Sequence, residues 1–243
     1  MKLLVDMGNT RLKWATVNDE QLITGEPLLN TQLSQQTLMN IWQSLTEPKQ
    51  LVIACVTANH SLALVMAVAV SLWADINIVR VSSQAQSLGL TNAYLHPEKL
   101  GVDRWLALIA ARHFYAVPAC VVDCGTAITV DLIDADGHHL GGLISAGLAL
   151  MKKSLAHGTD ALPFSDTSYP LEAANFTEAA IYSGTLLAAV GLIEQVLAKH
   201  GNVSVILTGG DAALIAPHLS IKAIVDPNLV LRGLAIVADK STD

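Results

Sequence analysis

Charged and aromatic side chains are scarce in this sequence. Of its 243 residues, 14% are charged and 5% are aromatic, whereas 52% are hydrophobic. This apolar fraction is ample for a buried core, so the sequence predicts a folded protein. The formal net charge of −7 argues against a nucleic-acid-binding surface, so an anionic ligand would have to be met by local positive groups such as Lys13 and Arg104.

Long apolar runs and paired cysteines are also missing. The longest candidate run, residues 62–70, is shorter than the about 20 residues that a spanning helix needs. Only two residues precede the first expected strand, so we expect no signal peptide, no membrane partner and a cytoplasmic location. The three cysteines form an odd set without Cys-x-x-Cys spacing, which favours reduced, buried thiols at Cys55, Cys120 and Cys124.

The P-loop motif Gly-x-x-x-x-Gly-Lys-Ser/Thr is absent, which argues against a P-loop kinase. A different glycine loop occurs twice instead. The first copy is Asp6-Met7-Gly8-Asn9-Thr10, and the second is Asp123-Cys124-Gly125-Thr126-Ala127. Each copy follows an apolar run and leads into another strand-like stretch, so both are predicted to be the tips of β-hairpins.

The residue types in these loops suit phosphate binding. A glycine lets the backbone approach a ligand, and its N–H can point at phosphate oxygens. Asp6 and Asp123 would repel phosphates unless a hard cation lay between, which indicates Mg²⁺ held partly through water. One Asp-x-Gly-x-Thr segment alone is typical of a tight turn. Two copies at strand ends favour two related halves around one nucleotide, with the parts that phosphoryl transfer needs.

The expected order of elements also repeats. Residues 2–28 have the pattern of a three-stranded meander followed by alternating helices and strands, and the same order returns from residue 119. We therefore expect an α/β fold of two ribonuclease-H-like (actin-like ATPase) domains, each a mixed sheet flanked by helices, at residues 1–116 and 117–243. The expected helices span about 31–45, 59–73, 97–115, 147–158 and 177–200, with a last one after Pro227.

A further motif, Gly101-Val102-Asp103-Arg104, begins an apolar helix. Backbone N–H groups and the helix dipole favour an anion at such a helix start. Arg104 offers a planar fork for a carboxylate, and Asp103 can accept a proton from a hydroxyl group as phosphorus is attacked. The alternative is an exposed aspartate at a helix start, paired with its neighbouring arginine.

Together these segments resemble a known family. The chain is similar to the acetate and sugar kinase, Hsp70 and actin superfamily and, within it, to the type III pantothenate kinases. The segments that carry the resemblance are Asp6-x-Gly-Asn-Thr-x-x-Lys13, Gly101-Val-Asp-Arg104, Asp123-x-Gly-Thr-Ala-x-Thr-x-Asp131, Gly141-Gly-Leu-Ile-Ser-Ala-Gly147, Ser154-Leu155 leading to Thr159 and Leu162-Pro163, and Thr177-x-x-Ala-Ile-x-x-Gly184.

The resemblance implies ATP-dependent phosphorylation of pantothenate to 4′-phosphopantothenate, the first step of coenzyme A biosynthesis, by a homodimer that uses Mg²⁺ and a monovalent cation, K⁺ or NH₄⁺. It implies that Asp103 is the catalytic base, that Asp123 binds the monovalent cation and that Asp6 holds Mg²⁺ through water. The ATP-binding residues would be Asp6, Met7, Gly8, Asn9, Thr10, Arg11, Leu12, Lys13 and Thr126. The pantothenate-binding residues would be Tyr94, Gly101, Val102, Asp103, Arg104 and Thr177.

Two residue groups have further expected roles. Thr177 begins a long helix and would ordinarily be its N-cap, and the resemblance lets its hydroxyl face pantothenate as well. Thr208-Gly209-Gly210-Asp211 is placed like the adenosine-side loop of the superfamily, where a simple strand-to-helix turn is the alternative.

Two other functions stay open at this point. The first is a kinase of another small acceptor, such as a sugar, or a phosphatase of the same superfamily. A neutral sugar would give Arg104 no carboxylate to bind. A nucleotide-binding accessory regulator would bind ATP without turnover, and a DNA-contacting version would need a basic patch. The net charge of −7 and the presence of Asp6, Asp103 and Asp123 count against that regulator.

Overall fold

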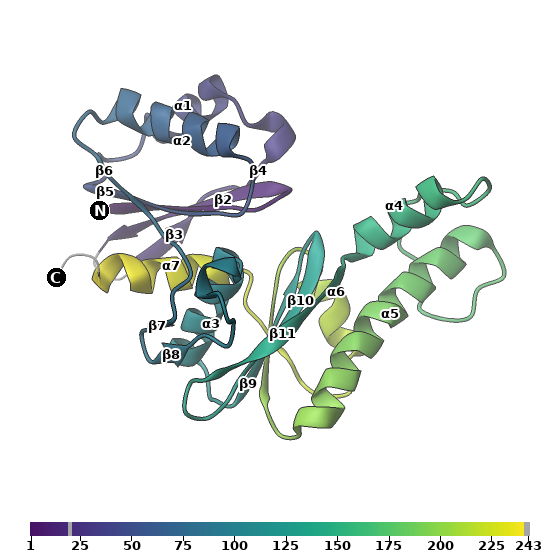
Figure 1. The fold of residues 1–243 in the computed structure, drawn as a ribbon. Coiled ribbons are helices and arrows are strands. Elements are labelled where there is room, and N and C mark those ends of the chain that lie inside the picture. The colour runs from purple at the N-terminus through teal and green to yellow at the C-terminus, as the bar shows by residue number, and fades with distance from the viewer. Residues whose placement is uncertain (19–20, 241–243) are drawn as a thin grey trace. The chain divides into compact units, whose positions relative to one another are not determined.

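The structure is a computed structural model that describes residues 1–18 and 21–240. The chain forms two compact units (Figure 1). The first consists of Met1–His113 together with the segment that starts at Asn228, and the second is Phe114–Pro227. Each unit has a mixed sheet with flanking helices, so the predicted α/β class is confirmed.

The first unit is built on a six-stranded sheet. Its main path is β3-β2-β1-β5-β6, and β4 pairs with β2. The pairs β1–β2 and β2–β3 are antiparallel, whereas β1, β5 and β6 run parallel. The strands are β1 (Lys2–Met7), β2 (Arg11–Asn18), β3 (Gln21–Thr24), β4 (Leu28–Leu29), β5 (Gln50–Cys55) and β6 (Asn77–Arg80).

Helices cover both faces of this sheet. Leu3 and Val5 of β1 share one hydrophobic cluster with Trp42 of α1 and Val65 of α2. Helix α7 contacts β1, β2 and β5 and lies on the opposite face (Figure 1). The elements of this unit other than the sheet are η1 (Asn30–Gln32), α1 (Gln35–Trp42), α2 (Asn59–Leu72), the hairpin β7 (Gln86–Ser87) and β8 (Leu90–Thr91), η2 (Pro97–Lys99), α3 (Val102–Phe114) and α7 (Leu229–Lys240).

The last helix belongs to the first unit, although the sequence places the boundary between residues 116 and 117 and assigns this helix to the second half. Its buried side chains, among them Leu229 and Leu234, lie against the first sheet. Lys2 Nζ donates to the carbonyl oxygen of Ala238 at 2.7 Å and pairs with Asp239 at 2.8 Å. These contacts join residues 236 and 237 positions apart, which sequence pattern alone does not reveal.

The second unit repeats the topology of the first. Its sheet has the order β11-β10-β9-β12-β13, with antiparallel pairs at β10–β11 and β9–β10 and parallel pairs at β9–β12 and β12–β13. The elements are β9 (Ala119–Cys124), β10 (Ala127–Ile133), β11 (His139–Ala146), α4 (Leu148–Gly158), α5 (Thr177–His200), β12 (Ser204–Thr208), α6 (Ala212–Ile215), η3 (Ala216–His218) and β13 (Ile224–Val225).

Helix α5 is the one described helix that has the length and apolar composition needed to cross a membrane. The sequence prediction did not single it out. In the structure 56% of its most apolar stretch is buried, and its residues Tyr182, Leu186 and Ile193 pack in the hydrophobic cluster of the second unit. Core packing therefore accounts for its apolar character.

Candidate active site

The first glycine loop joins β1 to β2, as predicted. The N–H of Gly8 donates to the carbonyl oxygen of Arg11 at 3.0 Å, which closes the hairpin. Asp6 lies directly opposite Lys13 in the ladder, so their side chains share one face of the sheet. Asp6 is only 8% exposed. A buried carboxylate and a lysine thus flank the same end of this loop.

The N-terminus of α3 places Asp103 and Arg104. The N–H of Trp105 donates to the carbonyl of Gly101 at 3.0 Å, and the N–H of Arg104 donates to Asp103 Oδ1 at 2.8 Å. The Asp103 side chain folds back over Gly101, where an added Cβ would lie 2.6 Å from Oδ1. A larger residue at position 101 would therefore displace the Asp103 carboxylate from this position.

Tyr94 and Arg104 lie together, although ten residues separate them in the chain. Arg104 is 7% exposed, and its Nη1 donates to the hydroxyl of Tyr94 at 2.9 Å. The guanidinium carbon lies 5.7 Å from the centre of the Tyr94 ring, within cation–π range. The Tyr94 N–H donates to Asn92 Oδ1 at 3.0 Å, and Asn92 Nδ2 donates to the carbonyls of Gln84 and Pro97. Asn92 therefore fixes the loop that carries the tyrosine.

A polar cavity of about 540 Å³ lies beside the start of α3. Gly101 and Val102 line it, next to Asp103 in the chain. Its walls also carry the cationic side chains of Arg80 and Lys99, which can meet an anion. Arg80 is the last residue of β6, and the carboxyl ends of adjacent parallel strands are a common place for ligand sites.

The second glycine loop joins β9 to β10 and is held by close backbone approaches. The Gly147 N–H donates to the carbonyl of Thr126 at 2.9 Å, and a methyl group added at Gly147 would overlap the carbonyl oxygen of Gly125. Gly209, at φ +91°, approaches from β12, where an added Cβ would lie 2.5 Å from Asp123 Oδ1. Two glycines from outside the loop thus allow it to pack against its neighbours.

Thr208 brings a hydroxyl group to the same sheet end. It pairs with Asp123 in the parallel ladder, and it is 1% exposed. Its Oγ1 has no hydrogen-bond partner among the residues that the structure describes. A buried, unsatisfied hydroxyl is unfavourable unless a water or an ion satisfies it. The oxygen-rich end of β9 and β12 is therefore suited to a cation.

The three cysteines are free, and they differ in environment. Burial, with a smaller effect of the Asp131 charge, raises the pKa of the Cys120 thiol from 9.0 to about 12. Burial and the nearby charges of Asp123 and Asp211 raise the pKa of Cys124 well above its usual range. Cys55 is half-buried and lines the polar cavity. The prediction of reduced, buried thiols therefore fits Cys120 and Cys124 best.

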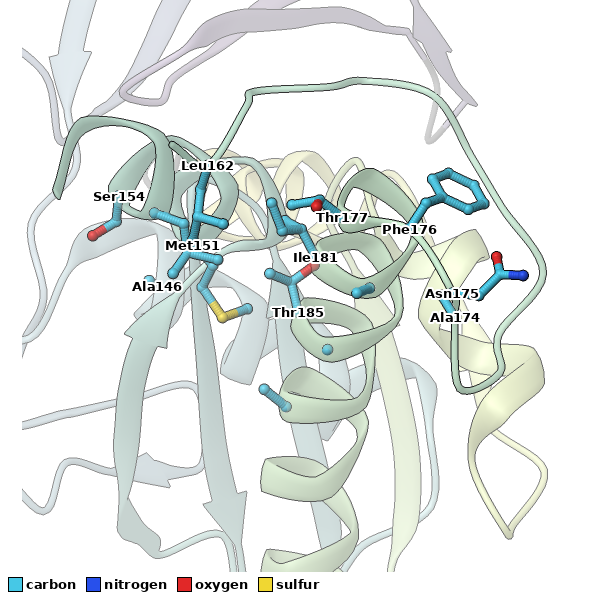
Figure 2. A pocket seen from close by; sticks show the side chains of 14 residues that line it. Ala146, Met151, Ser154, Leu162, Ala174, Asn175, Phe176, Thr177, Ile181 and Thr185 are labelled. Carbon is cyan, nitrogen blue, oxygen red and sulfur yellow. The ribbon is translucent and has the colours of Figure 1, made fainter. Parts of the chain in front are cut away.

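Thr177 lies at an apolar cavity of about 870 Å³ between α4 and α5. Figure 2 shows Met151 of α4 facing Ile181 and Thr185 of α5, with Thr177 at the upper end. The expected N-cap role of Thr177 is wrong: Phe176 occupies the cap position, and no side chain caps the helix. The Thr177 hydroxyl therefore does not cap α5.

The predicted residues fall into sets. Within the first unit the structure brings Asp6 opposite Lys13, and Tyr94 against Arg104. Within the second, Asp123 lies beside Gly125 and Gly209, while Thr177 lines a separate cavity. Sequence reasoning missed Asn92, Arg80 and also Asn30, whose side-chain amide donates to the carbonyls of Gly8 and Asn9 in the first glycine loop. Only Asn92 has a local signal, because an asparagine side chain often bonds to the backbone two residues later.

Comparisons with known proteins agree with this fold and these motifs. Residues 2–199 match the family model described as type III pantothenate kinase. A protein of that name from Nitrosococcus oceani is 38% identical and covers 98% of this chain and 94% of its own. Another, from Dechloromonas aromatica, is 36% identical and covers 99% of this chain and 100% of its own.

Solved structures share the fold. A protein described as a Baf family transcriptional activator from Campylobacter jejuni has a TM-score of 0.61 and 23% identity, covering 99% of this chain and 98% of its own. A 2-dehydro-3-deoxygalactonokinase-type protein from Sinorhizobium meliloti has a TM-score of 0.59 and 16% identity, and an archaeal actin homolog has 0.51 and 15%; both cover 99% of each chain. The actin-like, ribonuclease-H-like fold class is therefore confirmed.

Proposed function

Because the chain belongs to the type III pantothenate kinase family, it phosphorylates pantothenate with ATP in the first step of coenzyme A biosynthesis, and we propose the roles that its own residues take. The observation that carries this proposal is the start of α3. There Gly101 leaves room for the Asp103 carboxylate, and Arg104 is fixed beside it by Tyr94. A hydroxyl-activating base and a carboxylate-binding cation thus occur on neighbouring residues.

Asp103 is the general base of the proposed reaction. The primary hydroxyl of pantothenate gives its proton to this carboxylate as its oxygen bonds to the γ-phosphorus of ATP. The bond from that phosphorus to the β,γ-bridging oxygen breaks, and ADP leaves with the electron pair. The hydrogen bond from the Arg104 N–H to Asp103 Oδ1, at 2.8 Å, holds the carboxylate in one orientation. Oδ2 is the oxygen proposed to take the proton.

Arg104 and Tyr94 bind and orient the acceptor. The carboxylate of pantothenate would meet a guanidinium whose direction is already set by the Tyr94 hydroxyl and ring. Such a preset cation loses little freedom on binding, which favours a correctly placed hydroxyl. Gly101 and Val102 contribute the backbone wall of the adjacent cavity.

The loop from Asp6 to Lys13 binds the phosphates of ATP. Its backbone N–H groups and the Lys13 ammonium would offset the charge that develops on the γ-phosphoryl group. Thr126 of the second loop is a further proposed ATP contact, and the loop from Thr208 to Asp211 is the proposed adenosine contact. Open space for a nucleotide there adjoins Gly210, where an added Cβ would meet nothing within 4 Å.

Two cations fit the donor sets. Asp6 offers a hard carboxylate oxygen at the phosphate loop and would hold Mg²⁺ through water, which would neutralise phosphate charge. Asp123 and the buried Thr208 hydroxyl, which has no hydrogen-bond partner in the described part of the chain, offer oxygen ligands to a monovalent cation, K⁺ or NH₄⁺. That ion would supply positive charge at this end of β9 and β12.

The protein is proposed to act as a homodimer in the cytoplasm. An apolar cavity lies between α4 and α5, and Phe176 and Leu187 expose about half of their surface on the same region of the second unit. A second copy would cover these side chains and bring its own Thr177 into the interface. A single-chain mass in sedimentation equilibrium would contradict this assembly.

The first test is ADP release from MgATP, with and without pantothenate, in K⁺ and then in Na⁺ buffer, with the product identified by mass. We expect turnover that requires pantothenate and is faster in K⁺. Asp103→Asn should lower kcat by roughly 10² to 10⁴ because the proton acceptor is lost while the shape is kept.

Asp75→Asn is the matched control, because Asp75 is exposed on the turn before β6. Its kcat should equal that of the unaltered protein. An Asp103→Asn variant with near-normal turnover would contradict the role of this base.

A further inference from the structure

We propose that Asn30 is a positioning residue that holds the β1–β2 loop, residues 8–10, in its phosphate-binding conformation. This inference rests on the proposed function, in which the loop binds the phosphates of ATP. Asn30 lies at the start of η1, outside the motif and twenty or more residues from the loop that it contacts.

The side-chain amide of Asn30 bonds to two consecutive carbonyl groups. Its Nδ2 donates to the carbonyl oxygens of Gly8 and Asn9, each at 2.9 Å. An amide nitrogen carries two hydrogens, so these two bonds use both. The backbone N–H of Asn30 donates to the next carbonyl, that of Thr10, at 2.9 Å. One residue therefore binds three successive carbonyls of the loop.

The direction of the carbonyls sets the direction of the N–H groups. In a planar trans peptide the C=O of one residue and the N–H of the next point in opposite directions. Since the carbonyls of Gly8 and Asn9 point at Asn30, the N–H groups of Asn9 and Thr10 point away from it. Successive N–H groups on one side of a glycine loop form an anion-binding concavity. Asn30 thus keeps the acceptor oxygens away from the side where phosphate oxygens would bind.

Substitution of the Asn30 side chain removes its contacts with the loop carbonyls and leaves the local backbone contacts in place. In Asn30→Ala the backbone bond to Thr10 and the β2–β4 pairing remain possible, and only the two amide bonds are lost. In Asn30→Asp the shape is kept, but a carboxylate oxygen replaces the donor and faces two carbonyl oxygens. Both changes leave the loop carbonyls free to turn toward a ligand.

The test compares the KM for ATP with the KM for pantothenate in folded variants. Loss of two hydrogen bonds that order the loop should raise the KM for ATP by roughly tenfold in Asn30→Ala, and by more in Asn30→Asp. The KM for pantothenate should stay within about twofold of the unaltered value. Calorimetric titration with a non-hydrolysable ATP analogue should show the same loss of affinity as the KM for ATP.

Asn40 is the matched control. It is exposed on α1, and its Oδ1 accepts a hydrogen bond from Gln36 at 2.8 Å, so Asn40→Ala and Asn40→Asp make the same chemical changes away from the loop. Both should leave both KM values unchanged. If Asn30→Ala does not fold, Asn30→Asp carries the test, because its volume is that of asparagine.

The outcomes separate this inference from the proposed function. If folded Asn30 variants bind the ATP analogue normally while Lys13→Ala binds it weakly, the loop binds phosphate but Asn30 does not position it, and this inference is overturned. If Lys13→Ala also binds normally, the proposed phosphate role of the loop fails. A parallel rise in both KM values together with a lowered thermal midpoint would indicate a purely structural asparagine and would also overturn the inference.

Discussion

The two Asp-x-Gly loops have the same place in their hairpins, and they are held by different means. The loop at Gly8 is held by a polar side chain: Asn30 binds its carbonyls, and an added Cβ on Gly8 would meet only the Arg11 carbonyl, at 3.3 Å. The loop at Gly125 is held by the neighbouring backbone: the Gly147 N–H donates to the Thr126 carbonyl, and Gly147 and Gly209 come so close that neither has room for a methyl group. Two loops with the same sequence motif are therefore held in place by different contacts.

The difference predicts different sensitivities to mutation. A loop held by hydrogen bonds tolerates added volume but not the loss of a donor. A loop held by glycine approach tolerates no added volume, because backbone atoms cannot move aside as a flexible side chain can.

Of the changes at these two loops, the most damaging should be Gly147→Ala. Its new methyl group would overlap the carbonyl oxygens of Gly125 and Thr126, so β11 and the loop would have to separate. We expect a loss of about 3 kcal/mol in the free energy of unfolding, measured by urea denaturation.

Gly191→Ala is the control for this variant. Gly191 lies inside α5 of the same unit, and an added Cβ would meet nothing within 4 Å. Alanine should stabilise the helix there by up to about 1 kcal/mol. Equal stability of the Gly147 and Gly191 variants would contradict the packing account of the second loop.

Alanine at the two loop glycines themselves should have a smaller effect. The added Cβ would lie 3.3 Å from the Arg11 carbonyl at Gly8 and 3.2 Å from Asp123 Oδ1 at Gly125, contacts that small shifts relieve. We expect each to cost about 1 kcal/mol of stability or less. Gly125→Ala should also displace the Asp123 carboxylate and raise the K⁺ concentration for half-maximal activation. Gly8→Ala, as the paired control, should leave that concentration unchanged, and a shift in both variants would contradict the assignment of Asp123.

Thiol labelling of the unaltered protein should show a difference between the cysteines that lie next to the two loops. Cys55 lies beside Met7 in the ladder next to the first loop, whereas Cys124 precedes Gly125 in the second. A thiol-specific reagent at pH 8 should modify Cys55 in the folded protein, and all three cysteines only after denaturation. Cys120 and Cys124 are buried, and burial raises their pKa values, so both thiols stay neutral in the folded protein.

The same pKa shifts give stability a pH dependence. A thiol whose pKa is raised by folding stabilises the protein fully below its unfolded pKa, and that contribution declines as pH rises toward the folded value. For Cys120 this window runs from 9.0 to about 12. Rapid modification of Cys124 in the folded protein at pH 8 would contradict the tight packing of its loop.

Much of this fold was predictable from sequence periodicity. The bounds of α5 were predicted without error at Thr177 and His200, and both hairpins follow from apolar runs that are interrupted by an Asp-x-Gly turn. The hairpin of β7 and β8 was missed because its strands have two residues each, too few for a periodic pattern.

The candidate site was predictable only where its residues lie within short motifs. Asp103 and its glycine are adjacent in sequence, so their relationship could be expected. The contacts of Asn30 with Gly8, and of Gly147 with Gly125, join residues more than twenty positions apart, and spacing gives no signal of them. Such long-range contacts depend on the register of the strands and on the conformation of the loops, which only the structure shows.

The packing of α7 on the first sheet also has a consequence for synthesis on the ribosome. Residues 114–227 are one continuous segment, whereas the first unit needs both the start of the chain and the segment from Asn228. The second unit is thus completely synthesised before α7 exists. Strand β1 is synthesised before the second unit, but it cannot pack against α7 until that helix emerges. The unit that contains β1 is therefore completed after the second unit, although β1 precedes the second unit in the chain.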